Sequence, residues 1–264
     1  MDHFYRLTRQ QRSLIGQLAW REITGRYQGA FFGLLWPLIN PLLMLAIYSF
    51  VFGTVFQSRW FDGSPNTVNF TLNLFVGLIV FGFFSECLVR APNLIIENTN
   101  YVKKVIFPLE ILSVASVVAA LFHACLGFCL LALVLIFDGK FELSILWLPL
   151  VLAPLVVLTA GVSWCLASVG VFVRDIRQVI GMMTTALLFL SPVFYPSSAL
   201  PSWLQNWMAL NPLTLPIEQS RAVLLLGQPP DWGGLALYGL IAVACAWAGL
   251  TWFKKTRPGF SDVL

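Results

Sequence analysis

One stretch of the chain decides its fold: residues 26–56 read RYQGAFFGLLWPLINPLLMLAIYSFVFGTVF, and no charged side chain occurs from 31 to 56. A helix that rises about 1.5 Å per residue crosses a hydrocarbon core of about 30 Å within this length. Gly33, Pro37 and Pro41 interrupt the apolar run. A spanning helix interrupted in this way needs neighbours that satisfy its freed backbone groups. The stretch therefore predicts a bundle of membrane helices rather than a single anchor.

The composition extends this interpretation to the whole chain. Of 264 residues, 58% are hydrophobic and 11% are charged, whereas soluble domains carry roughly 25% charged residues. The pattern predicts an all-α integral membrane protein with six transmembrane helices. The predicted spans are residues 31–56, 71–96, 111–137, 143–173, 178–195 and 232–253. Residues 1–30 form a separate cytoplasmic unit before this transmembrane domain of residues 31–264.

Two further helical features flank the spans. In residues 4–27 the apolar Leu14, Leu18 and Ile23 follow helical spacing among several arginines, which predicts an amphipathic helix in the cytoplasmic interface. Such a helix either binds anionic lipid headgroups or docks a protein partner. After Tyr195 the chain is rich in proline and tryptophan, and short re-entrant helices are predicted over residues 202–210 and 216–226 on the outer face.

Basic residues set the predicted orientation. The predicted cytoplasmic segments carry Arg6, Arg9, Arg12, Arg21, Arg26, Lys103, Lys104, Arg174, Arg177, Lys254, Lys255 and Arg257, and the opposite side carries Arg59, Lys140 and Arg221. The positive-inside rule then places both termini in the cytoplasm. The net charge of +4 is distributed over separate loops, so no nucleic-acid partner is expected.

Catalytic chemistry has little support in the sequence. No cluster of His, Cys, Asp and Glu, no H-E-x-x-H, no G-x-S-x-G and no G-x-x-x-x-G-K-[ST] phosphate loop occurs. We therefore expect no catalytic residue, metal site or cofactor on this chain. If it moves a substrate uphill, ATP hydrolysis must take place on another chain.

Few ionisable residues fall within the predicted spans. Glu86 and Arg90 stand four residues apart with the acid first, which predicts an intrahelical pair that neutralises itself. Glu218 and Arg221 repeat this logic at a spacing of three. His123 is expected to be a hydrogen-bonded packing residue rather than a proton relay.

Two segments are candidates for transport and coupling. Asn40, Met44, Tyr48, Phe52 and Phe56 recur every four residues, so they form one stripe of the first predicted span. The stripe either lines a path, where aromatic faces pack against sugars, or packs against other helices and lipid. Residues 97–108 are polar, then basic, and end in Phe-Pro; they form a cytoplasmic coupling element or a loop that sets topology.

The chain resembles the membrane subunits of ABC exporters for cell-surface polysaccharides, such as O-antigen, capsule and teichoic-acid exporters. The resemblance rests on LAWREI at 18–23, RY at 26–27, GLLWPLINPL at 33–42, KKVIFP at 103–108, VRDI at 173–176, SPVFY at 191–195 and NPL at 211–213. It implies a homodimer in the bacterial inner membrane with two separate ATPase subunits, which bind the ATP and Mg²⁺. The translocation path would run between the protomers and carry a lipid-linked polysaccharide.

The resemblance also implies roles for particular residues. The first and fifth spans would line the path, so its expected residues are Tyr48, Phe52, Phe56, Phe189, Phe194 and Tyr195. The expected residues of ATPase coupling are Arg21, Arg26, Tyr101, Lys103 and Lys104. Two other functions stay open: an ABC permease that exports lipids or drugs, and an intramembrane enzyme of envelope biosynthesis.

Overall fold

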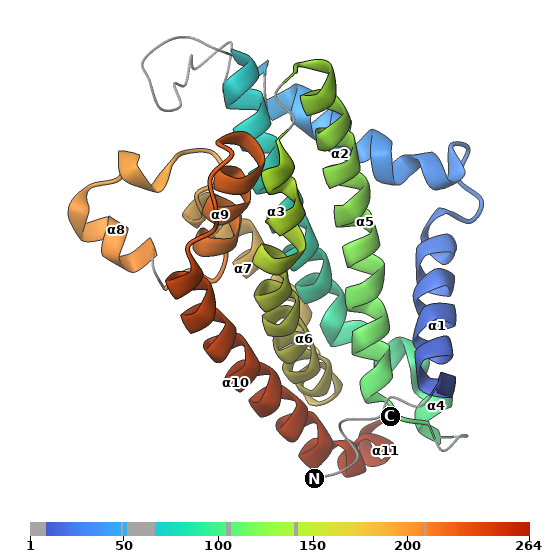
Figure 1. Cartoon of the computed structure of the whole chain (residues 1–264). Helices are drawn as coiled ribbons and strands as arrows, with labels where there is room; N and C mark the ends of the chain where they lie inside the picture. The colour runs from blue at the N-terminus through green and yellow to red at the C-terminus, as the bar shows by residue number, and fades with distance from the viewer. Residues whose placement is uncertain (1–8, 49, 52–66, 104–106, 140–141, 209) are drawn as a thin grey trace.

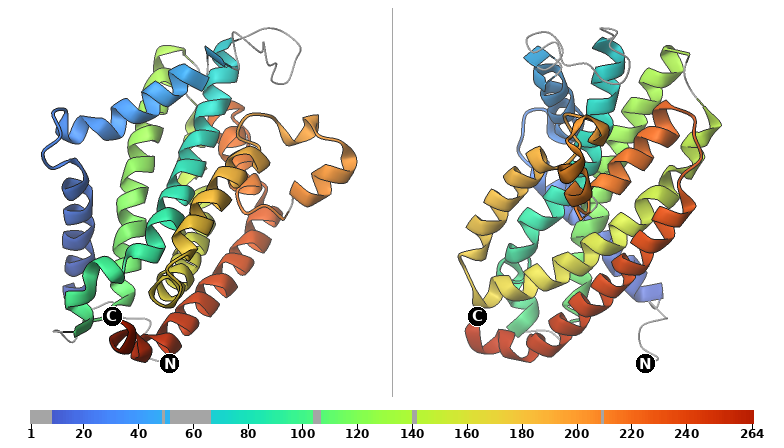
Figure 2. Two further views of the ribbon diagram at one scale, coloured as in Figure 1. Left: turned by 180° about the vertical axis from the view of Figure 1, so that it is seen from behind. Right: turned by 90° about the vertical axis from the view of Figure 1, so that its left-hand side faces the viewer.

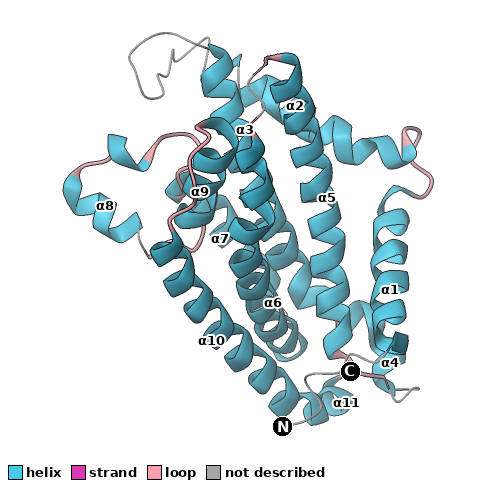
Figure 3. Cartoon of the chain, in the orientation of Figure 1, coloured by secondary structure: helices cyan, strands magenta, loops and turns pink. Residues whose placement is uncertain are grey.

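The structure is a computed structural model that describes residues 9–48, 50–51, 67–103, 107–139, 142–208 and 210–264. Within these ranges every regular element is a helix, which confirms the all-α prediction (Figure 3). Four segments are long and apolar enough to cross a membrane: Phe70–Asn93, Glu110–Phe137, Leu143–Phe172 and Trp232–Val263. They correspond to the second, third, fourth and sixth predicted spans.

The described helices follow one another along the chain from blue to red (Figure 1). Their bounds are α1 Arg9–Tyr27, α2 Trp36–Tyr48, α3 Thr67–Arg90, α4 Thr99–Lys103, α5 Glu110–Phe137, α6 Leu148–Phe172, α7 Ile176–Leu190, α8 Ser202–Met208, α9 Thr214–Leu225, α10 Trp232–Thr256 and α11 Phe260–Val263. The two short helices α8 and α9 lie where the sequence predicts a broken hairpin, and α8 projects from the side of the bundle (Figure 1).

The first and fifth predicted spans are shorter helices in the structure. α2 begins at Trp36, after a 3₁₀ turn over Gly33–Leu35, rather than at residue 31. The chain beyond residue 51 and up to residue 66 lies outside the described residues. α7 ends at Leu190 instead of near Tyr195, because Ser191 is extended and the following proline cannot continue a helix. Six spans therefore stay a prediction.

α1 packs along the bundle, which differs from the flat interfacial helix that the sequence predicts. Glu22 contacts Ser116 and Tyr27 contacts His123, so α1 and α5 run in the same direction. His123 lies 13 residues after Glu110, about 20 Å along α5. The C-terminal end of α1 is therefore level with the middle of α5 (Figure 1).

A sharp bend follows α1. Gly29 has φ 86° and Gly33 has φ 46°, two left-handed conformations that glycine adopts at little cost. The bend separates the direction of α1 from that of α2 (Figure 2).

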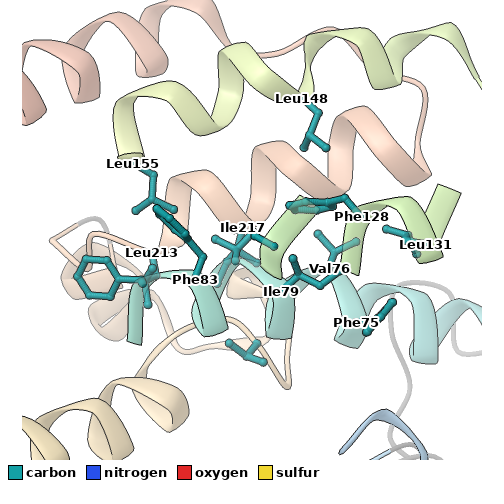
Figure 4. Close-up of a cluster of buried hydrophobic side chains, with 14 of the residues drawn as sticks. Phe75, Val76, Ile79, Phe83, Phe128, Leu131, Leu148, Leu155, Leu213 and Ile217 are labelled. Atoms are coloured by element: carbon teal, nitrogen blue, oxygen red, sulfur yellow. The ribbon is translucent and has the colours of Figure 1, made fainter. Parts of the chain in front are cut away.

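The core is built around α3. In its most apolar window 67% of the residues are buried, against 22% for α10, so α3 is central and α10 peripheral. α10 accordingly exposes Leu240 and Trp247, as expected of a helix that faces lipid. The core residues labelled in Figure 4 are Phe75, Val76, Ile79, Phe83, Phe128, Leu131, Leu148, Leu155, Leu213 and Ile217.

Glycines allow α6 to approach its neighbours closely. A Cβ on Gly249 of α10 would lie 2.1 Å from the carbonyl oxygen of Gly161 of α6. A Cβ on Gly170 of α6 would lie 2.3 Å from the carbonyl oxygen of Pro92, just after α3. Small residues at such crossings are the usual means by which membrane helices gain packing contacts.

Candidate functional site

The principal candidate site is a cluster of ionised side chains between α1 and α3. Glu22 and Arg26 lie on α1, and Glu86 and Arg90 lie on α3. Arg26 Nη1 is 2.6 Å from Glu86 Oε1, and Arg90 Nε forms an ion pair with Glu22 Oε1. Within the described residues Glu86 and Arg90 thus pair across to α1 and not with each other. The predicted intrahelical pair is wrong, because each side chain finds its partner on the facing helix.

α5 supplies further hydrogen bonds to this cluster. His123 Nδ1 lies 3.0 Å and 3.1 Å from the two carboxylate oxygens of Glu86, and Ser116 Oγ donates to Glu22 Oε1 at 3.0 Å. The hydroxyl of Tyr27 is 3.4 Å from His123 Nε2. Burial raises the pKa of the Tyr27 phenol, which keeps its proton available for this contact. His123 is hydrogen-bonded, as the sequence predicts.

A cavity of about 680 Å³ begins at the charged cluster. Arg26, Glu86 and His123 form its polar end, and α2, α3 and α5 supply most of its apolar wall. From the stripe predicted on the first span, Asn40 and Met44 line this cavity. The side chain of Tyr48 is not described, and Phe52 and Phe56 lie outside the described residues.

The other predicted path residues gather beyond the end of α7. The rings of Phe189 and Phe194 stack with centroids 5.6 Å apart, and the Tyr195 hydroxyl donates to the carbonyl of Phe189 at 2.8 Å. Phe189 is exposed and Phe194 is buried. None of the three lines the cavity, although Leu188 of α7 does.

Arg221 of α9, whose sequence spacing suggested a pair with Glu218, fixes the segment after α7. Its guanidinium donates to the carbonyls of Asn73 at 3.0 Å, Pro192 at 2.6 Å and Val193 at 3.0 Å, and its exposed fraction is 5%. Asn211 Nδ2 supports the same segment by donating to the carbonyl of Leu190 at 3.1 Å. Sequence patterns missed this arrangement, because backbone carbonyls leave no signature in side-chain spacing.

The predicted coupling residues meet around α4. Arg21 Nη1 donates to the Tyr101 hydroxyl at 3.0 Å, and the Tyr101 ring stacks on Phe107 at 4.6 Å. Lys103 donates to the backbone carbonyl of Leu264. Lys104 lies outside the described residues. Arg26 does not join this group, because it belongs to the charged cluster and the cavity.

The C-terminal segment supports the same end of the bundle. Arg257 donates to Glu110 Oε2 at 3.3 Å and to the carbonyl of Phe107 at 3.0 Å. Phe260 is fully buried against Phe253 and Phe172. α4, α11 and the ends of α6 and α10 therefore lie at one end of the molecule (Figure 1). Lys103, Lys254, Lys255 and Arg257 make this end basic. No group that could hold a metal ion occurs among the described residues.

The fold is thus an apolar helical bundle with a cluster of ionised groups beside a cavity, and ionised groups within a membrane bundle mark functional positions. The chain belongs to the ABC-2 type transporter family, whose model matches residues 13–225. It is 29% identical over 260 residues, 96% of both chains, to the O-antigen export system permease protein RfbA of Myxococcus xanthus. It is also 24% identical over 246 residues, 92% of both chains, to a protein of the same name from Klebsiella pneumoniae.

Family membership defines the class of this protein. It is a multi-pass membrane subunit of a transporter, and such a subunit works with an ATPase rather than acting as an enzyme itself. The prediction of an ABC exporter permease is thereby confirmed. The intramembrane enzyme considered from the sequence is set aside.

Proposed function

We propose that this chain is the permease subunit of an ATP-driven exporter that moves a lipid-linked cell-surface polysaccharide, of O-antigen or capsule type, across the bacterial inner membrane. The observation that carries the proposal is similarity over 96% of the chain to a permease named for O-antigen export. Similarity over almost the whole length includes both the helical bundle and its basic end. This chain then exports the same kind of polymer as that permease and is coupled to the same kind of ATPase.

The basic end is the surface that faces the ATPase in this proposal. α4 stands at this end with Arg21 on one side and the C-terminal residue Leu264 on the other. The positive-inside rule favours a cytoplasmic location for a surface so rich in lysine and arginine, and both termini then lie in the cytoplasm. Two ATPase subunits bind ATP and Mg²⁺ and press on α4 when they close.

The polysaccharide path lies between two copies of the chain. α2 and α7 are the helices at this interface, as the first and fifth of six spans. Both expose large apolar side chains, including Ile47 on α2 and Met182 on α7, which a partner copy can cover. Phe189 and Tyr195 stand at the outer end of α7, where aromatic faces pack against sugar rings.

A purified complex tests the proposal. The chain is extracted in mild detergent together with candidate P-loop ATPases from the same cell, and the mass of the complex is measured. Two permease and two ATPase chains are expected. In a deletion strain the surface polysaccharide should disappear and return when the gene is restored.

The outcomes separate this proposal from its alternative. An intact surface polymer in the deletion strain contradicts polysaccharide export, even if the ATPase complex forms. A complex whose ATP hydrolysis responds to lipids or drugs, but not to lipid-linked polysaccharide, indicates the alternative class of ABC permease. A chain that repeatedly purifies without an ATPase contradicts both.

A further inference from the structure

The two charged pairs between α1 and α3 share one sequence pattern. α1 carries Glu22 and Arg26, α3 carries Glu86 and Arg90, and in each helix the acid precedes the base by four residues. The facing helices run in opposite directions, so Glu22 meets Arg90 and Arg26 meets Glu86. Only an antiparallel arrangement of two identical patterns gives two attractive pairs at once.

We propose that these four residues form a register lock, in which Glu86 and Arg90 are positioning residues that hold α1 at one height on α3 during transport. This proposal deepens the proposed function, because it assigns a link between the coupling end and the core helix. "Register lock" denotes Glu22, Arg26, Glu86 and Arg90 throughout.

The lock excludes the neighbouring registers by repulsion. If α1 slides by four residues, about 6 Å, in one direction, Arg26 comes to face Arg90. A slide in the other direction brings Glu22 to face Glu86. Both slides replace attraction by repulsion between like charges, which is a device that specifies register in helical assemblies.

Burial gives this repulsion its strength. The side chains of Glu22 and Glu86 are 10% and 20% exposed, and those of the two arginines are about 30% exposed. Charges enclosed in this way lose much of the solvent screening that weakens surface pairs. Ser116 and His123 of α5 add a second partner to each carboxylate, so α5 helps to fix the acids in place.

The height of α1 on α3 affects coupling because α1 also carries Arg21. Arg21 directly precedes Glu22 and contacts Tyr101 and Asn98 of the coupling segment. A movement of α4 driven by the ATPase therefore reaches Arg21 and, one residue further, the register lock on α3. If α1 were free to slide along α3, this movement would displace α1 alone and would not move the core helix α3.

Exchanging the charges distinguishes a register lock, which needs repulsion in the slipped registers, from two ion pairs that only attract. The double variant Arg26→Glu with Glu86→Arg keeps both facing pairs attractive, but it also makes both slipped registers attractive. The quadruple variant Glu22→Arg, Arg26→Glu, Glu86→Arg and Arg90→Glu restores attraction in the native register and repulsion in the slipped ones. Glu142→Lys, a charge reversal at an exposed side chain at the opposite end of the bundle, is the matched control.

The register is measured as the distance between two spin labels, by double electron–electron resonance in the full complex with its ATPase. Nitroxide labels are placed on exposed Gln17 of α1 and exposed Leu146, which precedes α6 at the far end of the bundle. The labelled chain is mixed with an excess of unlabelled chain, so that only one of the two permease copies in a complex carries the labels. The native chain, the control and the quadruple variant should then each give one distance. The double variant should add a second distance, shifted by about 6 Å for a slide of four residues, and should move severalfold less polymer per ATP hydrolysed.

The distance measurement tests the register lock, and the transport measurement tests the proposed function, so the two can be contradicted independently. One distance in the double variant, with native transport per ATP, overturns the register lock and leaves only two ordinary ion pairs. If the native complex moves no polysaccharide at all, the proposed function fails, and the distance distributions still decide whether α1 has one register. A quadruple variant that binds the ATPase but shows several registers also contradicts the proposal.

Discussion

Arg26 Nη1 and Glu86 Oε1 lie 2.6 Å apart, and this pair joins the end of α1 to the middle of the bundle at the edge of the cavity. The same carboxylate accepts a hydrogen bond from His123, so helices α1, α3 and α5 meet at one side chain. Ionised groups within spanning helices are costly and mark functional positions. Substitution of Glu86 is therefore the most direct test of this junction of three helices.

Glu86→Gln should destabilise the folded chain, because, among the described residues, it leaves Arg26 with only Glu22, 3.9 Å away on the same helix, as a carboxylate partner. Because both side chains are only partly buried, the cost should lie below the roughly 3–5 kcal/mol of a fully buried pair. Thermal unfolding in detergent, followed by intrinsic tryptophan fluorescence, measures the effect. Glu97→Gln is the control, because Glu97 is half-exposed and lies 3.8 Å from Arg90. Equal unfolding temperatures for the two variants would contradict an important role of the Glu86 pair.

Arg221→Lys should loosen the segment that follows α7. A lysine ammonium is a single point of charge, whereas the planar guanidinium reaches the carbonyls of Asn73, Pro192 and Val193 at once. The loss of two hydrogen bonds from a charged donor is expected to cost roughly 3 kcal/mol. Limited proteolysis after Leu190 should become faster than in the control Arg177→Lys, whose side chain is exposed. Identical cleavage rates would show that the three carbonyl contacts do not hold this segment.

Gly170→Ala should separate α6 from the end of α3. The new Cβ would lie 2.3 Å from the Pro92 carbonyl oxygen, which is backbone and has no rotamer to change. Overpacking of this kind costs about 1–3 kcal/mol. Gly181→Ala on α7 is the matched control, because nothing lies within 4 Å of its added Cβ. Yield of folded protein by gel filtration and its unfolding temperature should fall for the first variant alone.

Lys103→Glu with Lys104→Glu should uncouple the ATPase while leaving insertion into the membrane intact. Lys103 lies on α4 and bonds the C-terminal residue Leu264, so its charge reversal disturbs the surface proposed to face the ATPase. The measurement is ATP hydrolysis of the reconstituted complex with and without substrate. The control Glu142→Lys, at an exposed side chain at the opposite end of the bundle, should keep its stimulation. Normal export by the double variant would remove the coupling role of this segment.

Hydropathy and proline placement predicted most of the helices. The apolar runs located the four long helices, and Pro201, Pro212 and their neighbours located the broken hairpin that contains α8 and α9. The same signals overestimated α2 and α7. An apolar run continues through Gly33 and Pro192 without interruption, but the helix does not, because backbone geometry ends it there.

Residue spacing in the sequence did not predict contacts whose partners lie on another helix. Spacing of four residues suggested that Glu86 and Arg90 neutralise each other, yet both bind α1. Arg21 and Tyr101 were expected in one coupling group and do meet, whereas Arg26 was expected there and lies at the cavity. A periodic pattern reports which face a residue occupies, but it contains no information about the helix that packs against that face.

The position of α1 has a consequence for the order of events during synthesis. Arg26 leaves the ribosome before Glu86, Arg90 and His123 exist, because all three lie later in the chain. At about 5–20 residues per second, roughly 5–20 s pass before His123 has been made. During that interval α1 waits outside the bundle, with its charges in water or among lipid headgroups. α1, the first helix of the described residues, therefore cannot dock until α5 has been made.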